Sequence, residues 1–322
     1  MNAVLTALGP VFVLIMAGYA LRRAGFPERR PGGKFSRLVG GQRLWPFAEA
    51  LTYYLLLPSL LFHSLARATF DASAVGPIAA SLSGTILIIG GATLLLRPWL
   101  GLSGPSFGSV FQGVIRPNTY VGVAPVFALW GADGLALLAI AIVSVIPLVN
   151  LLSVIVVSRT GERGAPPPSP LALIGLVVRN PLIVACCLGL AASLAGLPLP
   201  DWLQLLLTAL GTAAMPVGLL TVGAALDLQA LRGAVPTIIA TSITKLVLFP
   251  LVAGLIGMSS GLSGVAIGVV LLYGGLPISA SAYVLARLLG GDATLVAGTL
   301  TATTLAAFAT MPMIILLLPH LP

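Results

Sequence analysis

The sequence predicts an all-α integral membrane protein with about ten transmembrane helices. Hydrophobic residues make up 58% of the chain, charged residues make up only 7%, and the mean hydropathy is +1.10. A soluble globule of this length needs more polar surface than these residues supply. The apolar residues also gather in runs of about 20 residues, the length at which a helix crosses a bilayer.

The apolar runs are separated by short turns, which leave no room for a soluble domain. The first run has no basic segment before it and no small-residue cleavage site, so we expect a retained helix and not a signal peptide. Cys186 and Cys187 are adjacent on one predicted helix and point apart, so they predict neither a disulfide nor a zinc site. The predicted helices lie near residues 3–21, 47–66, 74–96, 106–130, 135–157, 176–195, 203–225, 233–256, 264–286 and 294–318.

Basic residues are concentrated in the odd-numbered loops between the predicted helices, whereas the even-numbered loops hold little beyond Arg67. We expect the protein to lie in the cell (inner) membrane. By the positive-inside rule, its odd-numbered loops face the cytoplasm, and both termini lie on the opposite side, outside the cytoplasm. The net charge of +8 is therefore a sign of topology and of contact with anionic lipid, and it does not predict nucleic-acid binding. The first loop contains Arg22, Arg23, Arg29, Arg30, Lys34, Arg37 and Arg43, and later odd-numbered loops contain Arg97, Arg159, Arg163, Arg232 and Arg287.

A charged and proline-rich linker at 159–170 divides the chain into residues 1–158 and 171–322, with five predicted helices in each part. An odd number of helices per part forces the two parts into opposite orientations, which predicts two inverted five-helix repeats. Proline pairs give this plan weak support. Pro58 and Pro216 lie in the second helix of each repeat, and Pro125 and Pro277 lie in the fourth.

The fourth apolar run contains a cation, an amide and helix breakers, in the order Arg116, Pro117, Asn118, Thr119 and Pro125. A proline inside a helix costs roughly 3 kcal/mol, and free backbone groups are tolerated at membrane depth only beside a polar cavity. We therefore expect this helix to be broken. The N-terminus of a half-helix presents free N–H groups and the positive end of a dipole, which attract anions.

We expect the two breaks at Pro125 and Pro277, and the residues around them allow two interpretations. They form a site for an anion, or they belong to kinked packing helices whose hydroxyl groups bond their own carbonyls. The two prolines around Asn118 favour the site for that residue, whereas the serines fit the packing interpretation better. The candidates are Asn118 and Thr119 before Pro125, with Tyr273, Ser279 and Ser281 around Pro277.

Arg116 and Lys245 are the cations deepest in the predicted helices. A charge at the membrane midplane costs about 2.5–3.5 kcal/mol on insertion scales, so each needs a compensating role. No aspartate or glutamate lies at similar depth in the sequence, and surplus positive charge suits an anionic substrate. The alternative for Lys245 is that it snorkels or caps the carbonyls of a broken helix.

The sequence leaves the coupling ion open between H⁺ and Na⁺. His63 is a candidate for coupling or gating, because the unperturbed pKa of a histidine is about 6.5, although such a residue more often bonds a neighbouring helix. Sodium would instead bind unwound carbonyls and the hydroxyl groups of the last helix, on Thr299, Thr301, Thr303 and Thr304. No motif predicts a metal site or another cofactor.

The sequence does not predict an enzyme. Two Gly-x-Ser-Gly segments, at 101–104 and 261–264, resemble the nucleophile motif of an intramembrane serine protease. Both lie at helix boundaries as turns, and the chemistry needs a histidine base beside the serine. Only His63 and His320 are present in the chain.

Several short motifs, in a shared order, resemble the auxin efflux carrier family. Pro117-Asn118-Thr119 with Gly122 and Pro125 resembles the crossover in the fourth helix of that family. The other matching segments are Pro58-Ser59-Leu60-Leu61-Phe62-His63, Arg179-Asn180-Pro181, and Leu276-Pro277 followed by Ala286-Arg287.

The resemblance implies a scaffold made of helices 1, 2, 6 and 7 and a transport domain made of helices 3–5 and 8–10. Broken helices 4 and 9 would cross and hold the substrate. It also implies a homodimer, elevator-type movement, and a small carboxylate substrate such as malonate, malate or an auxin-like acid. The chain departs from the plant members because it lacks their long central loop and a deep acidic residue.

The predicted function is secondary active transport of a small organic anion. A first rival function is that of a sodium-coupled carrier similar to the bile-acid transporters, although the missing deep carboxylates argue modestly against it. A second is that of a membrane sensor, which binds a ligand without moving it. A third is that of a passive channel.

Overall fold

The structure is a computed structural model that describes residues 2–26, 44–67, 72–162, 169, 175 and 178–320. In these residues nearly all regular structure is helical, and there is no β-strand. The all-α prediction is therefore confirmed. The elements are α1 (Asn2–Arg23), α3 (Leu44–Leu51), η2 (Thr52–Leu56), α4 (Leu57–Arg67), α5 (Ala72–Leu100), α6 (Gly104–Ile115), α7 (Thr119–Thr160), α9 (Pro181–Leu194), α10 (Asp201–Ala224), η3 (Ala230–Arg232), α11 (Val235–Ile243), η4 (Thr244–Leu248), α12 (Phe249–Ser259), α13 (Gly264–Gly274), α14 (Ser281–Leu289), α15 (Ala293–Leu317) and η5 (Leu318–His320).

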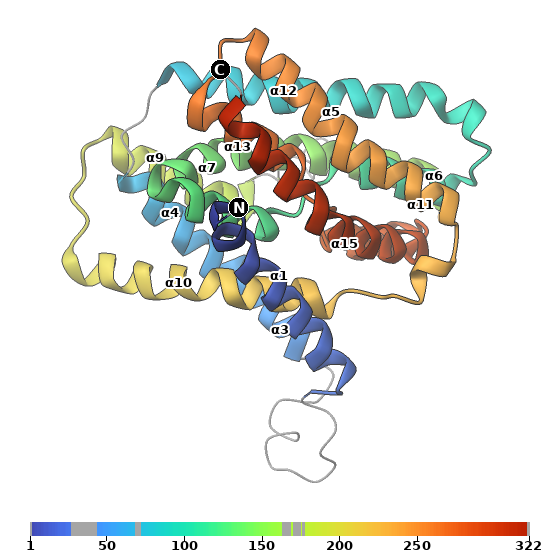
Figure 1. Cartoon of the computed structure of the whole chain (residues 1–322), viewed down its shortest axis with the longest axis horizontal. Helices are drawn as coiled ribbons and strands as arrows, with labels where there is room; N and C mark the ends of the chain where they lie inside the picture. The colour runs from blue at the N-terminus through green and yellow to red at the C-terminus, as the bar shows by residue number, and fades with distance from the viewer. Residues whose placement is uncertain are drawn as a thin grey trace. The chain divides into compact units, whose positions relative to one another are not determined.

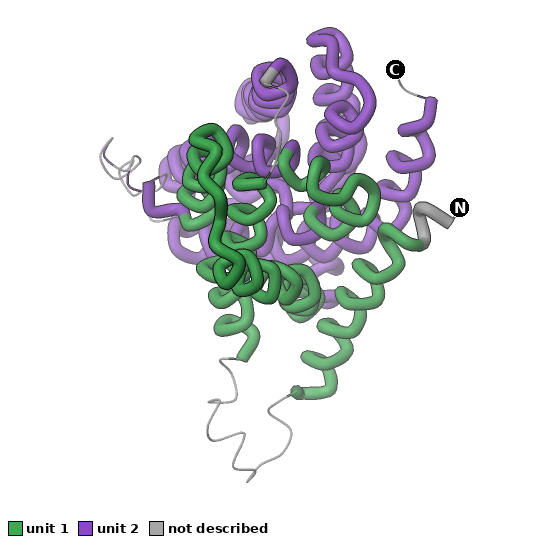
Figure 2. Tube along the Cα trace, turned by 90° about the vertical axis from the view of Figure 1, so that its left-hand side faces the viewer, with its two compact units in different colours: residues 1–69, 123–136, 181–226 green, residues 70–122, 137–180, 227–322 purple. Residues whose placement is uncertain are grey.

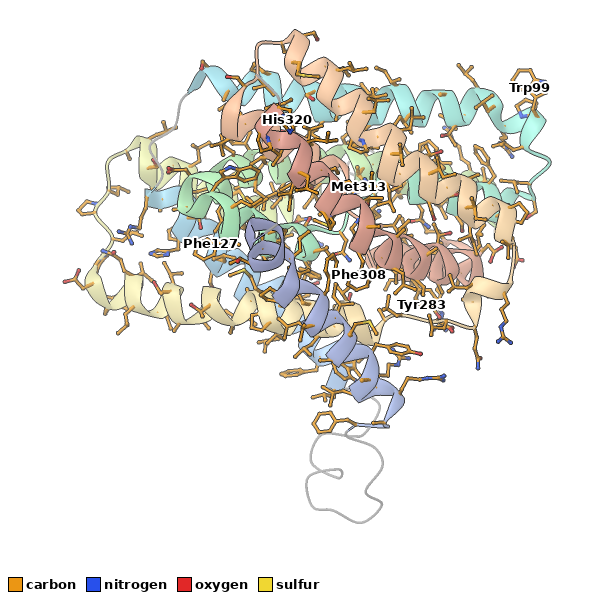
Figure 3. All side chains as sticks on the ribbon, in the orientation of Figure 1. Trp99, Phe127, Tyr283, Phe308, Met313 and His320 are labelled. Carbon is orange, nitrogen blue, oxygen red and sulfur yellow. The ribbon has the colours of Figure 1, made fainter. Side chains whose placement is uncertain are left out.

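Five of the described helical stretches are long and apolar enough to cross a membrane: Ser73–Leu100, Thr119–Thr160, Asp201–Ala224, Val235–Ser259 and Ala293–His320. The helices Pro181–Leu194 and Gly264–Gly274 are apolar but shorter. Large apolar side chains on the long helices are exposed, and Trp99 at the end of α5 points away from the protein (Figure 3). Trp99 is 78% exposed and Met313 is 63% exposed. Such surfaces suit a lipid environment, in which exposed apolar side chains carry no hydration penalty. The number of crossings and the inverted repeat stay predictions.

The chain folds into two compact units, and each is assembled from separate stretches of sequence (Figure 2). Unit 1 consists of residues 1–69, 123–136 and 181–226, and unit 2 consists of residues 70–122, 137–180 and 227–322. Unit 1 therefore contains α1, α3, α4, α9 and α10, and unit 2 contains α5, α6 and the helices from α11 to α15. The long helix α7 contributes to both units.

Within unit 1, glycines allow helices to pack with their backbones close together. A Cβ atom on Gly18 of α1 would lie 2.9 Å from the Cα atom of Leu220 on α10. A Cβ atom on Gly189 of α9 would lie 2.8 Å from the carbonyl oxygen of Phe62 on α4. Small residues at helix contacts are typical of membrane proteins, where van der Waals packing replaces the hydrophobic effect between helices.

Within unit 2, α12 packs against α5 and α13, and α15 packs against α6 and α11 (Figure 1). Asp292 joins two helix starts, because its carboxylate accepts the Leu295 N–H at the start of α15 at 2.9 Å and the Ser106 hydroxyl of α6 at 3.0 Å. Val110, Ile238 and Leu295 form a buried cluster between these helices. The packing holds α6 and α15 in register beside the interrupted segments described below.

Two details depart from regular helices. Helix α7 covers the second part of the fourth predicted run and all of the fifth, and it changes direction at Gly131, whose φ of 60° and ψ of −140° are not helical. Only glycine adopts this backbone conformation readily, so Gly131 allows the kink. In unit 2, α11 and α12 are joined through the π-helical turn η4 and form one long apolar helix.

Gly18→Ala should destabilise the protein, because the added methyl group collides with the backbone of α10. Overpacking of this kind costs about 1–3 kcal/mol. Gly9→Ala on the same helix is the matched control, since no described atom lies within 4 Å of its Cβ position. There the change should be neutral or stabilising, by up to about 1 kcal/mol from helix propensity. Thermal unfolding of both purified variants in detergent measures the difference, and equal midpoints would contradict the packing argument.

Candidate substrate site at two interrupted helices

The first interruption separates α6 from α7. Helix α6 ends at Ile115, and Arg116 (φ −100°, ψ 101°) and Asn118 (φ −91°, ψ 94°) are extended on either side of Pro117. Pro117 has no N–H group and disfavours a helical conformation at the residue before it. Asn118 is a favoured residue at the position before a helix, although its side chain makes no capping bond here.

The second interruption separates α13 from α14. Helix α13 ends at Gly274, α14 begins at Ser281, and the residues between them include Gly275 and Pro277. Pro277 acts on Leu276 as Pro117 acts on Arg116, because the residue before a proline is driven towards extended conformations. Two adjacent glycines, Gly274 and Gly275, and the nearby Pro277 therefore end this helix.

The two interruptions pair with each other inside unit 2. The Asn118 N–H donates to the Pro277 carbonyl at 2.8 Å, and the Ser279 N–H donates to the Arg116 carbonyl at 3.2 Å. Pro117 and Ile278 form the antiparallel bridge between these two bonds. The pairing brings together the starts of α7 and α14 and the ends of α6 and α13.

A further helix, α15, supports the pairing. The Ile278 N–H donates to the Thr303 hydroxyl of α15 at 3.3 Å. Gly122, in the first turn of α7, lies close to Leu276, since a Cβ atom there would be 2.8 Å from Leu276 Cδ1. The extended segments are thus held by backbone bonds, by a hydroxyl group and by close packing.

Arg116 places its guanidinium group beside the start of α14. Its Nε donates to the Ser281 Oγ at 3.1 Å, and its Nη2 donates to the Asn150 Oδ1 at 2.6 Å. The hydroxyl groups of Ser279 and Ser281 lie 2.9 Å apart. The guanidinium is always charged and offers several N–H donors in a fixed plane, so it can bind a carboxylate while it keeps these contacts.

Asn118 lies at the start of α7 with 1% of its surface exposed. Its side-chain nitrogen Nδ2 has no hydrogen-bond partner among the described residues. A buried donor without a partner costs about 1–3 kcal/mol, so such a group is expected to bind water or a ligand. Thr119 is the first residue of α7 and is half-buried. The start of α7 therefore offers donors and the positive end of a helix dipole.

Lys245 lies at the C-terminal end of a helix, whereas Asn118 lies at the start of one. It is fully buried, and its Nζ donates to the carbonyl oxygen of Gly274, the last residue of α13, at 2.8 Å. The ammonium thus caps the negative end of α13, which is the alternative that the sequence left open for this lysine. Tyr273, the residue before Gly274, is also buried.

The expected break at Pro125 is not observed, and this prediction is corrected. Helix α7 runs through Pro125, which lies in its second turn and in unit 1. The interruption falls earlier, at Pro117, so the helix has already restarted when the chain reaches Pro125. Prolines are tolerated in membrane helices where neighbouring groups satisfy the freed carbonyl. His63 lies on α4 in unit 1 and is half-buried.

The structure also shows two polar residues that the sequence analysis missed. Gln112 of α6 donates to the Ala282 carbonyl of α14 at 3.1 Å, and Asn150 of α7 accepts from Arg116. Both lie inside apolar runs, where a polar side chain is by itself an indication of function. Among the described residues, no group of three or more His, Cys, Asp or Glu side chains could hold a metal ion.

A family model described as "Membrane transport protein" matches residues 3–315, which is nearly the whole chain. The chain belongs to the auxin efflux carrier family. Proteins of the auxin efflux carrier family are membrane transporters, so the family prediction, the multi-pass membrane location and the transporter role are confirmed. No curated protein matches the chain in sequence. Both interruptions lie within the part that matches the auxin efflux carrier family.

Thr303→Val should destabilise the protein, because it removes the hydroxyl oxygen that accepts the Ile278 N–H. An unpaired buried N–H costs about 1–3 kcal/mol. Thr304→Val is the matched control, since Thr304 is also buried and its hydroxyl has no partner among the described residues. Thermal unfolding of both variants without ligand should show a lower midpoint for Thr303→Val alone. Similar losses in both variants would contradict the anchoring role.

Proposed function

We propose that the protein is a secondary active transporter of a small organic anion, a carboxylate such as malonate, malate or an auxin-like acid. The observation that carries the proposal is the pairing of the two interruptions, which presents the starts of α7 and α14 together with Arg116 and Asn118. Helix N-termini bind anions through free N–H groups and the helix dipole. The guanidinium of Arg116 supplies the charge and geometry that suit a carboxylate.

The electrostatic balance of unit 2 supports an anionic substrate. Arg116 and Lys245 bring positive charge to the region of the interruptions. The carboxylates of Asp227 and Asp292 accept backbone N–H groups at the starts of helical segments. Lys245 offsets the negative end of α13, and Arg116 follows the last residue of α6. The positive start of α7 then remains available to a negatively charged ligand, whereas the first N–H groups of α14 already have partners in the chain, so that helix contributes its dipole alone.

The proposal includes an elevator-type movement across the cell membrane. Unit 1 would act as the scaffold and would carry the homodimer contact, with the first, second, sixth and seventh of the ten predicted helices. Unit 2 would act as the transport domain, with the third to fifth and the eighth to tenth predicted helices. The grouping of the helices into two units supports this assignment, except that residues 123–136 of α7 belong to unit 1. The hydrogen bonds that hold the interruptions also lie within unit 2, so the site can travel with that unit. Two inverted repeats with outward-facing termini complete the proposed topology.

Uptake by purified protein in liposomes tests the function. Labelled malonate, malate and an indole carboxylate are offered with and without imposed proton and sodium gradients. Saturable, gradient-dependent accumulation of one of them supports the carrier and shows its coupling ion. Binding without uptake would instead support a sensor, and conductance far above carrier turnover would support a channel. The same assay tests whether proton-driven uptake depends on His63.

Asn118→Ala should weaken anion binding by at least about tenfold, because a hydrogen bond to a charged group contributes about 1.5–3 kcal/mol. Asn118→Asp should weaken it more, since a carboxylate of similar shape repels the substrate. Asn180→Ala removes another buried asparagine, just before α9, and should bind like the wild type. Affinity is measured by isothermal titration, with thermal unfolding as a check of folding. Unchanged affinity in a folded Asn118→Ala variant would contradict the assignment.

A further inference from the structure

The side-chain nitrogen of Lys245 lies at the C-terminal end of α13. Its Nζ lies 2.8 Å from the carbonyl oxygen of Gly274, and none of its surface is exposed. The last carbonyls of a helix carry partial negative charge, about half an elementary charge in sum. A cation in an apolar interior is costly unless it has a partner of this kind. The contact therefore stabilises both the lysine and the end of the helix.

The surroundings of Lys245 are built to hold a cation. Its Nζ lies 4.1 Å from the centre of the Phe249 ring, a distance at which the ring face attracts positive charge. The lysine lies on the π-helical turn η4, a distortion frequent at functional sites. Gly274 approaches this helix closely, since a Cβ atom there would be 3.0 Å from the Pro250 Cα atom. Any larger residue at Gly274 would push the carbonyl away from the ammonium.

The partners that the structure shows for Lys245 are both uncharged. They are the carbonyl of Gly274 and the ring of Phe249. Among the described residues of unit 2, the two aspartates have other partners, because Asp227 accepts the Gln229 N–H at 2.9 Å and Asp292 caps α15. The charge of Lys245 is thus balanced by a helix end and a ring face, which is how a bound inorganic cation would be balanced at the same place.

A coupling sodium ion would use this kind of position. In carriers with broken helices, unwound carbonyls and half-helix C-terminal ends coordinate Na⁺. Of the four threonine hydroxyl groups that the sequence suggested as further ligands, those of Thr299, Thr301 and Thr303 already have partners, whereas that of Thr304 has none among the described residues. Thr303 donates to the Thr299 carbonyl and accepts the Ile278 N–H, and Thr301 donates to the Ala297 carbonyl. The helix end therefore has a lysine where a sodium ion would otherwise be needed.

We propose that Lys245 is a tethered cation, whose ammonium occupies the position at the C-terminal end of α13 where a coupling cation would bind. The chain supplies its own counter-ion, so transport needs no sodium at this position. Removal of the ammonium leaves a space that a small external cation can fill. The statement about transport rests on the proposed function, whereas the occupancy of the helix end by a cation does not.

Chemical rescue of the thermal stability tests the occupancy. Lys245→Ala should lower the unfolding midpoint by several degrees, and ethylammonium chloride should restore most of that loss in a saturable way. Tetramethylammonium chloride at the same ionic strength is too bulky to enter and should have no such effect. Arg287→Ala, which removes an exposed arginine, is the charge-matched control and should show no rescue. The proposal is overturned if ethylammonium does not raise the unfolding midpoint of Lys245→Ala, or raises it only as much as that of Arg287→Ala.

A second variant keeps the test decisive if Lys245→Ala does not fold. Lys245→Met retains most of the length of the side chain without its charge. If the ammonium acts as a cation, Lys245→Met is less stable than the wild type and gains nothing from ethylammonium, since the methionine fills the space. A midpoint equal to that of the wild type would show that the lysine only fills space, and it would overturn the proposal.

Uptake in liposomes tests the consequence for coupling. Wild-type uptake should be the same with sodium, potassium or choline as the outside cation at constant pH. Uptake that requires a sodium gradient overturns the tethered-cation proposal, even though it would support transport itself. If the wild type takes up none of the tested anions, the proposed function fails, and the rescue of Lys245→Ala by ethylammonium still decides the occupancy.

Discussion

The pairing of two extended backbone segments is the constraint on which the rest of unit 2 depends. A membrane interior offers no water to an interrupted helix, so each free N–H or carbonyl group must find a partner in the protein. The segments around Pro117 and Ile278 supply these partners to each other, through the bonds from Asn118 to Pro277 and from Ser279 to Arg116. Either interruption alone would leave these groups unpaired. The two interruptions are therefore one structural element, although about 160 residues of sequence lie between Pro117 and Ile278.

The pairing also explains why the cations lie where they do. It places two helix starts and two helix ends in one region, and the helix ends carry negative partial charge. Lys245 offsets the end of α13 directly, through the carbonyl of Gly274. Arg116 follows the end of α6 and reaches the start of α14, where Ser281 and Asn150 orient it. Lys245 thus donates to the last carbonyl of one helix, and Arg116 donates to a hydroxyl group at the start of another. Their roles differ, although the sequence presents both as deep positive charges.

Hydropathy and proline positions predict much of this arrangement, and tertiary contacts account for the rest. Helices such as α5, α10 and α15 lie close to the predicted apolar runs because burial and span length depend on local composition. Interruptions at Pro117 and Pro277 follow from the missing N–H group. By contrast, Pro125 lies within α7, since a proline breaks a helix only where no neighbouring group compensates for it. The roles of Gln112 and Asn150 depend on partners from distant helices, and no local pattern encodes them.

The distribution of contacts bears on how such a site can operate. The bonds that shape the interruptions come from α6, α7, α14 and α15 within unit 2, and the cap of α13 comes from η4 in the same unit. A mechanism that opened the site by separating these helices would break buried backbone bonds, each of which costs about 1–3 kcal/mol when left unpaired. Movement of unit 2 as one body leaves all of them intact. The same reasoning fits the proposed role of the lysine at the end of α13: in the proposed movement, a tethered cation would travel with the helix that it caps, so the helix end would keep its counter-ion at every stage.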